Sequence, residues 1–393
     1  MEVKKVAVIG AGTMGHGIAQ IMATAGLDVK LVDISEELLK KALDKIRWSL
    51  QKFAEKKKIK PEEIDVIMGR IKTTTSLEEA CKDIDLMVEA VPEKMDLKKQ
   101  IFSKADQVAP PHAILATNTS SLSITEISEA TKRPDKVVGL HFFNPPQLMP
   151  LLEIVKGAHT SDETLQKAVE VGKLLKKTVV VVRKDVRGFI VNGVLSAVMN
   201  EAFWAVYRGE ATIEEVDAAT KFKLGFPMGM FELADFVGLD ILADVSKVMH
   251  EAFGERAKPC PLIEEYVKRG ELGKKTGKGF YDWSKGRPVI KFQLAGKFDH
   301  RRLQAVAANA AAWLIHDDVA DPKDIDTAMK FGTGWPQGPC EMADKIGIDT
   351  VVNKLNELYE KHKEEMYKPC PLLTEYVEKG WLGKKAKRGF YEY

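Results

Sequence analysis

The chain begins with a short apolar segment that runs directly into a glycine motif of the form Gly-x-Gly-x-x-Gly. Residues 6–9 have the character of a buried strand, the motif glycines are Gly10, Gly12 and Gly15, and helical spacing of apolar residues follows at Ile18 and Ile21. In such a motif the first glycine permits a tight turn, the second lets the backbone approach a pyrophosphate, and the third lets helix and strand pack closely. The sequence therefore predicts a dinucleotide-binding βαβ unit; the alternative is a glycine turn without a nucleotide.

A second predicted strand, residues 28–33, ends on Asp33, which lies 21 residues beyond Gly12. A carboxylate at this place binds the ribose 2′-hydroxyl and repels a 2′-phosphate. Because Ile34 and Ser35 follow and no arginine does, NAD is favoured over NADP. The expected cofactor-binding residues in this part of the chain are Gly10, Gly12, Thr13, Met14, Gly15 and Asp33.

The amino-acid composition limits the classes of protein to which the chain can belong. A chain of 393 residues is long enough for two or three domains, and 45% hydrophobic and 30% charged residues are typical of a soluble protein. The net charge of +2 provides no general attraction to nucleic acid or to a membrane. The four cysteines lack CxxC spacing, so we expect no metal site and a reduced, cytoplasmic protein. No secretory leader is expected, since the first five residues lead straight into the first strand.

Short apolar strands alternate with helical stretches up to about residue 184, which predicts an α/β Rossmann-type domain over 1–184 with a largely parallel, doubly wound sheet. The expected strands are 3–9, 28–33, 84–90, 113–117, 136–140, 151–155 and 178–182. Residues 36–68 interrupt the alternation as a basic helical excursion that is broken at Pro61. This segment is either a solvated helical hairpin or an arm that grips an anionic substrate through lysines such as Lys52 and Lys56.

The second half of the chain is helical and repeats itself. The segment 217–240 aligns with 326–349, a Lys-Pro-Cys-Pro-Leu string at 258–262 recurs at 368–372, and Gly-Phe-Tyr at 279–281 recurs at 389–391. We therefore expect two tandem all-α domains, 185–285 and 295–393, joined by a Gly/Pro-bearing linker. Such copies are expected to pack about a pseudo-two-fold axis as a dimer within one chain. Their paired Gly, Pro and Cys positions are expected to serve turns and core packing.

A candidate reaction site follows the strands of the first domain. His141 comes just after the expected strand 136–140, and Asn118 and Ser120 follow the expected strand 113–117. Glu153 interrupts an apolar strand, a costly position for a carboxylate without a partner. A histidine that a carboxylate orients, with hydroxyl and amide donors nearby, constitutes a general-base site. The alternative is that His141 merely ends a strand and Glu153 points to solvent.

These motifs together resemble the L-3-hydroxyacyl-CoA dehydrogenase family, and the resemblance covers essentially the whole chain. The segments that carry it are the glycine loop at 10–15, Val88-Glu89-Ala90-Val91-Pro92-Glu93, Asn118-Thr119-Ser120-Ser121, His141-Phe142-Phe143-Asn144-Pro145, Glu153 and Gly188-Phe189-Ile190-Val191-Asn192. The resemblance implies NAD-dependent oxidation of a (S)-3-hydroxyacyl-CoA, a substrate of fatty-acid β-oxidation. It also implies that the helical domains are of the 6-phosphogluconate dehydrogenase C-terminal-like type.

The resemblance implies roles for individual residues. His141 would be the base that removes the 3-hydroxyl proton, and Glu153 would orient it; Ser120 and Asn192 would hydrogen-bond the reacting oxygens. Further contacts with NAD would come from Glu93, Lys98 and Asn118, and the arm at 36–68, with Lys52 and Lys56, would touch coenzyme A.

The chain departs from the family pattern at Gly193, where the family usually has arginine, and at Arg301, which stands in the second copy where Asn192 stands in the first. One active site per chain is therefore expected, in a monomer or a further homo-oligomer. Two other readings stay open: a dehydrogenase of a free 3-hydroxy or sugar acid, and a cofactor-binding protein without turnover. Some family members are fused to an enoyl-CoA hydratase; no such domain is expected after Tyr393, and whether a longer natural chain carries one stays open.

Overall fold

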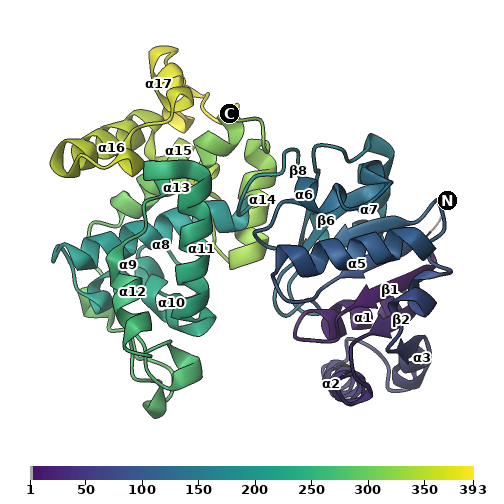
Figure 1. Cartoon of the computed structure of the whole chain (residues 1–393). Helices are drawn as coiled ribbons and strands as arrows, with labels where there is room; N and C mark the ends of the chain where they lie inside the picture. Colours follow the sequence, from purple (N-terminus) through teal and green to yellow (C-terminus); the bar gives the residue numbers. More distant parts are fainter. Residues whose placement is uncertain (1–2) are drawn as a thin grey trace. The chain divides into compact units, whose positions relative to one another are not determined.

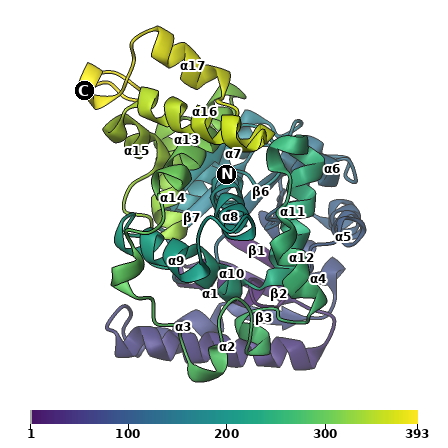
Figure 2. The same ribbon diagram turned by 90° about the vertical axis from the view of Figure 1, so that its left-hand side faces the viewer.

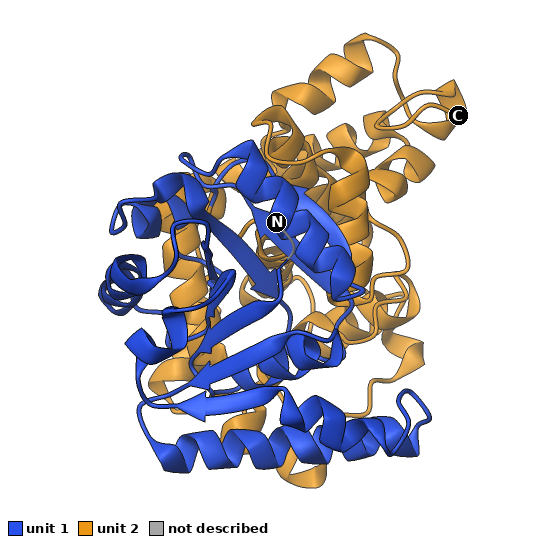
Figure 3. Ribbon diagram, turned by 90° about the vertical axis from the view of Figure 1, so that its right-hand side faces the viewer, with its two compact units in different colours: residues 1–186 blue, residues 187–393 orange. Residues whose placement is uncertain are grey.

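The computed structural model describes residues 3–393, and the chain folds into two compact units. The first ends at Val186 and the second spans Arg187–Tyr393 (Figure 3).

The first unit contains an eight-stranded sheet of order β3-β2-β1-β4-β5-β6-β7-β8 (Figure 1). Strands β1 to β6 are parallel, whereas β7 pairs antiparallel with β6 and parallel with β8. Their bounds are β1 Lys5–Ile9, β2 Asp28–Val32, β3 Ile71–Thr74, β4 Leu86–Glu89, β5 Ile114–Thr117, β6 Val137–Phe142, β7 Leu151–Val155 and β8 Thr178–Val182. Central strands β4 to β7 are buried along their whole length, as their continuous apolar runs require.

Helices cover both faces of this sheet. On one face, α1 Gly15–Thr24, α2 Glu36–Glu55, α3 Glu63–Gly69 and α7 Asp162–Leu174 enclose an apolar core. The other helices are α4 Leu77–Cys81, α5 Met95–Val108 and α6 Ile124–Ser128, with a short 3₁₀ turn η1 Pro134–Lys136. Figure 1 shows α5 crossing in front of the strands. The carboxyl ends of the parallel strands thus carry the loops that follow β1, β4 and β5, where ligands bind in doubly wound sheets.

The first glycine of the motif adopts a backbone conformation that favours glycine. Gly10 has φ +98°, and a Cβ there would lie 2.7 Å from the carbonyl oxygen of Ala90. A Cβ on Gly15 would lie 1.6 Å from the carbonyl oxygen of Gly10, so only glycine lets α1 begin this close to β1.

Two features of the sheet differ from expectation. Strand β3 was not expected, because Ile71-Lys72-Thr73-Thr74 is a short edge strand with a single buried residue. Strand β6 runs to Phe142, so His141 lies within the strand and not just after it. The strand extends this far because the antiparallel strand β7 pairs with His141 and Phe142.

The second unit consists of two helical series in the same order, linked through irregular chain and short 3₁₀ turns. The first series is α8 Val191–Tyr207, α9 Ile213–Phe222, α10 Met230–Val237, α11 Leu239–Phe253 and α12 Pro261–Lys268. The second is α13 Arg301–His316, α14 Pro322–Thr333, α15 Pro339–Ile346, α16 Ile348–His362 and α17 Pro371–Glu378 (Figure 2).

The residues that repeat along the sequence build the same local structure twice. The buried carboxylate of Asp217 accepts hydrogen bonds from the amides of Phe231 and Glu232 and from the Tyr281 hydroxyl. Burial raises the pKa of Asp217 to about 7 against the effect of these donors. In the second copy, Asp326 does the same with residues 340, 341 and 391. In each copy, the repeated aspartate therefore ties its own helix to the first turn of the helix that follows it.

The two copies pack on each other within this unit, with α8 against α13. A Cβ on Gly225 would lie 3.3 Å from Pro336 Cγ, and a Cβ on Gly334 would lie 3.3 Å from Pro227 Cγ. Phe226 and Trp335, which are equivalent positions, stack with ring centroids 4.2 Å apart. Such reciprocal contacts between equivalent residues are the signature of a two-fold interface.

Candidate active site

His141 and Glu153 face each other across the antiparallel pair β6–β7, at directly opposite register positions. The Nδ1 atom of His141 lies 2.6 Å from Oε2 of Glu153. Glu153 is 0% exposed and His141 is 5% exposed, so the carboxylate does not point to solvent. A buried carboxylate at this distance accepts a hydrogen bond from Nδ1–H and holds the ring orientation.

Residues 118–122, the serine loop, follow β5 and lie beside the strand that carries His141. The side-chain carbonyl of Asn118 accepts a hydrogen bond of 2.9 Å from the backbone amide of Phe142. This bond ties the serine loop to the residue directly after His141. Ser120 is half-buried, two residues further along the loop. The role of Asn118 as an NAD contact stays a prediction, and its observed partner is Phe142.

Glu93 lies at the base of the serine loop. Its Oε1 atom accepts hydrogen bonds from the Thr119 hydroxyl at 2.5 Å and from the Ser120 amide at 3.0 Å. Lys98 is enclosed, with a side chain 1% exposed and Nζ 2.7 Å from Glu89 and 3.3 Å from Glu93. The predicted contacts of Glu93 and Lys98 with NAD stay predictions. Glu89 was not a predicted site residue, although it lies in the segment 88–93 that carries the family resemblance and, like Glu153, is a carboxylate in an apolar strand.

The glycine loop and Asp33 are adjacent. Asp33 Oδ2 accepts a hydrogen bond of 2.7 Å from the Ala11 amide, and Oδ1 accepts one of 2.7 Å from the Ile34 amide. These two bonds fix the carboxylate at the end of β2 beside the loop that begins at Gly10. Gly12 and Thr13 are exposed, and a Cβ on Gly12 would meet nothing within 4 Å. The backbone is therefore open to a pyrophosphate, and these residues fit NAD.

The basic excursion is a long straight helix, α2, with α3 beside it (Figure 2). Lys52 pairs with Glu55 at 2.8 Å, and Lys56 is exposed at the end of the helix. Trp48, which sequence reasoning missed, is 63% exposed on the same helix. Spacing of three and four residues places it on one exposed face with Leu38, Lys41, Lys45, Lys52 and Lys56, which we call the α2 stripe. Only the burial of the neighbouring residues reveals this exposed indole.

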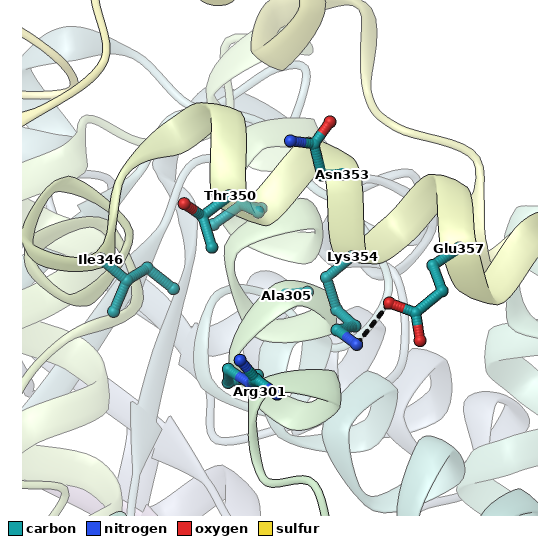
Figure 4. A pocket seen from close by; sticks show the side chains of 8 residues that line it. Arg301, Ala305, Ile346, Thr350, Asn353, Lys354 and Glu357 are labelled. Carbon is teal, nitrogen blue, oxygen red and sulfur yellow. Dashed lines mark hydrogen bonds and ion pairs between the residues drawn. The ribbon is translucent and has the colours of Figure 1, made fainter.

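The fourth predicted catalytic residue, Asn192, lies half-buried in the first turn of α8 in the second unit. Its counterpart Arg301 lines a cavity of about 240 Å³ between α13 and α16 (Figure 4). Asp299 accepts from Arg301 Nε at 2.8 Å and lies 3.1 Å from Lys354, which also pairs with Glu357. The second copy thus has ion pairs at the position that corresponds to Asn192.

Residues 3–393 contain neither a candidate metal site nor a candidate membrane-spanning helix. No group of three or more His, Cys, Asp or Glu side chains there is arranged to hold a metal ion. Within the same residues, every helix is too short or too polar to cross a membrane.

Comparison with known proteins places the chain in a family. The model of the 3-hydroxyacyl-CoA dehydrogenase NAD-binding domain matches residues 5–186, and that of the C-terminal domain matches twice, at 188–283 and 298–393. A probable 3-hydroxybutyryl-CoA dehydrogenase of Bacillus subtilis is 43% identical over 72% of this chain and 98% of its own length. The fatty acid oxidation complex subunit alpha of Idiomarina loihiensis is 36% identical over 97% of this chain, which covers 56% of that longer protein.

Among solved structures, 3-hydroxybutyryl-CoA dehydrogenase of Escherichia coli K12 has a TM-score of 0.91 and 30% identity, and the match covers 97% of this chain and 100% of that one. The match to the NAD-binding domain and these relatives also show that the chain is an oxidoreductase that acts on a CH–OH group with NAD. The chain therefore belongs to the 3-hydroxyacyl-CoA dehydrogenase family.

Proposed function

We propose that the protein oxidises (S)-3-hydroxyacyl-CoA to 3-ketoacyl-CoA with NAD, for example 3-hydroxybutyryl-CoA to acetoacetyl-CoA, in fatty-acid β-oxidation or related acyl-CoA metabolism. The observation that carries the proposal is the buried His141–Glu153 pair beside the serine loop of an NAD-binding domain. Loss of hydride and of a hydroxyl proton are the two events that such an oxidation requires, and the pair is suited to the second.

His141 acts as the general base in this proposal. Because Glu153 accepts from Nδ1–H, the neutral ring carries its lone pair on Nε2, which is the atom that takes the 3-hydroxyl proton. Glu153 then stabilises the imidazolium that forms. A base held in this way is worth about 10²–10⁴ in rate.

Bound NAD supplies the acceptor for the hydride from C3 of the substrate. The chain contributes the open glycine loop and the carboxylate of Asp33, with Gly10, Gly12, Thr13, Met14 and Gly15 at the pyrophosphate. We propose further contacts from Asn118, Glu93 and Lys98. Ser120 and Asn192 are proposed to hydrogen-bond the reacting oxygen, since a hydroxyl and an amide both donate to a developing carbonyl.

The α2 stripe supports coenzyme A as the substrate handle. An exposed indole offers a flat apolar surface on which an adenine can stack, and ammonium groups on the same face attract phosphates. Lys52 and Lys56 are proposed to serve the phosphates and Trp48 the adenine. A free 3-hydroxy acid has no group that such a face would recognise.

We propose three domains, 1–184, 185–285 and 295–393, the helical two being of the 6-phosphogluconate dehydrogenase C-terminal-like type. A single active site per chain is proposed, since Arg301 and its ion pairs replace the amide of Asn192 in the second copy. The reciprocal contacts of the two copies support a dimer-like interface within one chain. The four cysteines are all unbridged, which supports a reducing, cytoplasmic location.

Steady-state rates test the substrate. We expect kcat/KM for acetoacetyl-CoA and longer 3-ketoacyl-CoAs with NADH to exceed that of a free 3-oxo acid by at least about a hundredfold, because remote binding energy supports the reacting centre. Comparable values for free acids or sugar acids would contradict the proposal.

A further inference from the structure

The serine loop has two ends, and a different segment of the chain holds each of them. At the first end, the side chain of Asn118 accepts a hydrogen bond from the amide of Phe142. At the second end, the loop runs directly into Ser123 and the helix α6. The partner at this end is the carboxylate of Asp185, which lies 62 residues further along the chain than Ser123.

One oxygen of Asp185 accepts both hydrogen bonds at this end. Its Oδ2 atom lies 2.6 Å from the Ser123 hydroxyl oxygen and 2.8 Å from the backbone nitrogen of Thr125. The Ser123 hydroxyl oxygen in turn accepts from the amide of Glu126 at 3.1 Å, as the N-cap of α6. The carboxylate, the N-cap and two amides of the first turn therefore form one hydrogen-bonded group. Bonds to an ionised acceptor are about twice as strong as those between neutral groups.

Asp185 is itself fixed to the sheet. It follows the last residue of β8 by three positions, and the amide of Val186 donates to the carbonyl of Lys184 at 2.9 Å, so that a tight turn encloses it. The Thr125 hydroxyl also accepts from the amide of Ala158 at 3.0 Å, in the chain that follows β7. The end of the serine loop is therefore anchored through the ends of β7 and β8.

Ser120 lies between the two anchors, two residues after Asn118 and three before Ser123. Its backbone amide donates to Glu93 at 3.0 Å, and the path of the chain beyond it depends on the bonds at Ser123. Loss of those bonds frees the side of the loop that follows Ser120. A displacement of about 1 Å at a reacting group is enough to lower a rate by about a hundredfold. The anchor thus affects the chemistry as well as the fold.

We propose that Asp185 is a positioning residue, which holds the end of the serine loop so that the Ser120 hydroxyl reaches the reacting oxygen. It acts through Ser123 and the first turn of α6, and this role requires no contact with NAD or substrate. The inference rests on the role proposed above for Ser120. When Asp185 is removed, the first end of the loop keeps its own bond between Asn118 and Phe142.

The first test replaces the carboxylate. Asp185→Ala removes both hydrogen bonds, and we expect kcat with acetoacetyl-CoA and NADH to fall about ten- to a hundredfold. The dissociation constant of NADH, measured by fluorescence, should change less than about twofold, because the glycine loop and Asp33 are untouched. Asp185→Asn retains an oxygen that can accept from both donors, so its kcat should return to within about threefold of the unmodified protein. An Asp185→Asn variant as slow as Asp185→Ala, or an unchanged kcat in Asp185→Ala, would overturn the inference.

Ser161→Ala is the matched control for a general loss of stability. The Ser161 hydroxyl is the N-cap of α7 in the same unit and accepts from the amide of Thr164 at 3.1 Å. Its removal weakens the start of a different helix, so we expect kcat to stay within about twofold of that of the unmodified protein. If Ser161→Ala lowered kcat as much as Asp185→Ala does, the effect would be one of stability and the inference would be wrong.

A double-mutant cycle tests whether Asp185 acts through Ser120. In Ser120→Ala the hydroxyl that Asp185 positions is absent, so adding Asp185→Ala should lower kcat by less than about a further twofold. The same fold-loss in both backgrounds would contradict the inference. Ser120→Ala by itself separates the two proposals. Full activity there contradicts the role of Ser120, whereas a slow Ser120→Ala beside a fully active Asp185→Ala contradicts only the inference on Asp185.

Discussion

His141 and Glu153 occupy opposite register positions of β6 and β7, and their side chains meet 2.6 Å apart in the interior of the sheet. Within residues 3–393, β6 and β7 form the only antiparallel pairing of this sheet, and the pair lies between these two strands. Antiparallel neighbours present side chains at directly opposite positions, so this reversal of β7 sets a carboxylate against the imidazole.

The first prediction concerns this pair. Glu153→Gln should lower kcat about ten- to a hundredfold and His141→Ala about 10²–10⁴-fold, with little change in the affinity for NAD, because a base and its orienting group act on the chemical step. Stopped-flow or steady-state measurement of kcat and NADH binding checks this. His112 pairs with Asp85 at 3.0 Å elsewhere in the same unit, and His112→Ala is the matched control that should keep full kcat. An active His141→Ala enzyme would contradict the assignment.

Asp33 should set the choice between NAD and NADP. A 2′-phosphate would lie against its carboxylate, and a like-charge contact of about 3 kcal/mol corresponds to roughly a hundredfold in kcat/KM. We therefore expect kcat/KM for NADP to be lower than for NAD by about this factor, and Asp33→Ala to narrow the ratio. Asp28→Ala, at the opposite end of the same strand, should leave the ratio as it is. Equal use of both cofactors by the unmodified protein would mean that Asp33 does not face the ribose.

The α2 stripe should bind coenzyme A. Trp48→Ala and the charge reversal Lys52→Glu/Lys56→Glu should each raise KM for acyl-CoA, the charge reversal more strongly at low salt, with an unchanged KM for NAD. Lys40→Glu is the control, because Lys40 is exposed on the same helix but lies off the stripe. If Lys40→Glu raised KM as much as the stripe variants, the effect would reflect overall charge and not a binding face.

Arg302 should be essential to the interface between the helical copies. Its guanidinium donates to Glu201 at 2.6 Å and to Glu210 at 2.7 Å, and Glu201 is fully buried. Arg302→Met leaves a buried carboxylate without its cation, so we expect a loss of about 3–5 kcal/mol in the free energy of unfolding. Arg302→Met/Glu201→Gln should recover much of that loss. Denaturant titration of both variants measures this, and equal stability of the single variant and the unmodified protein would show that the pair contributes nothing.

Truncation after residue 296 tests the same interface. Without the second copy, the face of α8 that packs on α13 becomes exposed, and we expect the shortened chain to aggregate or to pair with itself. Analytical ultracentrifugation distinguishes these outcomes from a soluble, fully active monomer, which would contradict the expectation.

Titration of the full chain with NAD should give one site per chain.

Glu93 should contribute to stability in a pH-dependent way. Its pKa is lower in the folded chain than the ordinary value of 4.5, so its contribution is present above about pH 4.5 and is lost as the pH falls through the lower folded value. The difference in unfolding free energy between the unmodified protein and Glu93→Gln should be constant near neutral pH and shrink below about pH 4.5. A difference that stays constant down to pH 3 would contradict a lowered pKa.

Local sequence patterns predicted much of the fold and the main candidate residues. The glycine spacing, the strand before it and the carboxylate of Asp33 predicted the dinucleotide fold, because these features lie within one βαβ unit and depend on short-range geometry. The duplication was also readable, since each copy repeats its own turn and packing residues, such as Asp217 and Asp326. His141 and Glu153 were recognisable as candidates from residue type and position alone.

Tertiary structure decided the rest, because it depends on register and on contacts between distant segments. Glu153 could have faced solvent; the pairing of β7 with β6 turned it inward against His141. The enclosure of Lys98 by Glu89 and Glu93 and the exposure of Trp48 follow from how α5 and α2 pack on the sheet, which periodicity along one helix does not specify. Strand β3 forms at the edge that β2 offers. Its β-branched residues favour a strand, but a four-residue edge strand with one buried residue leaves no burial pattern in the sequence.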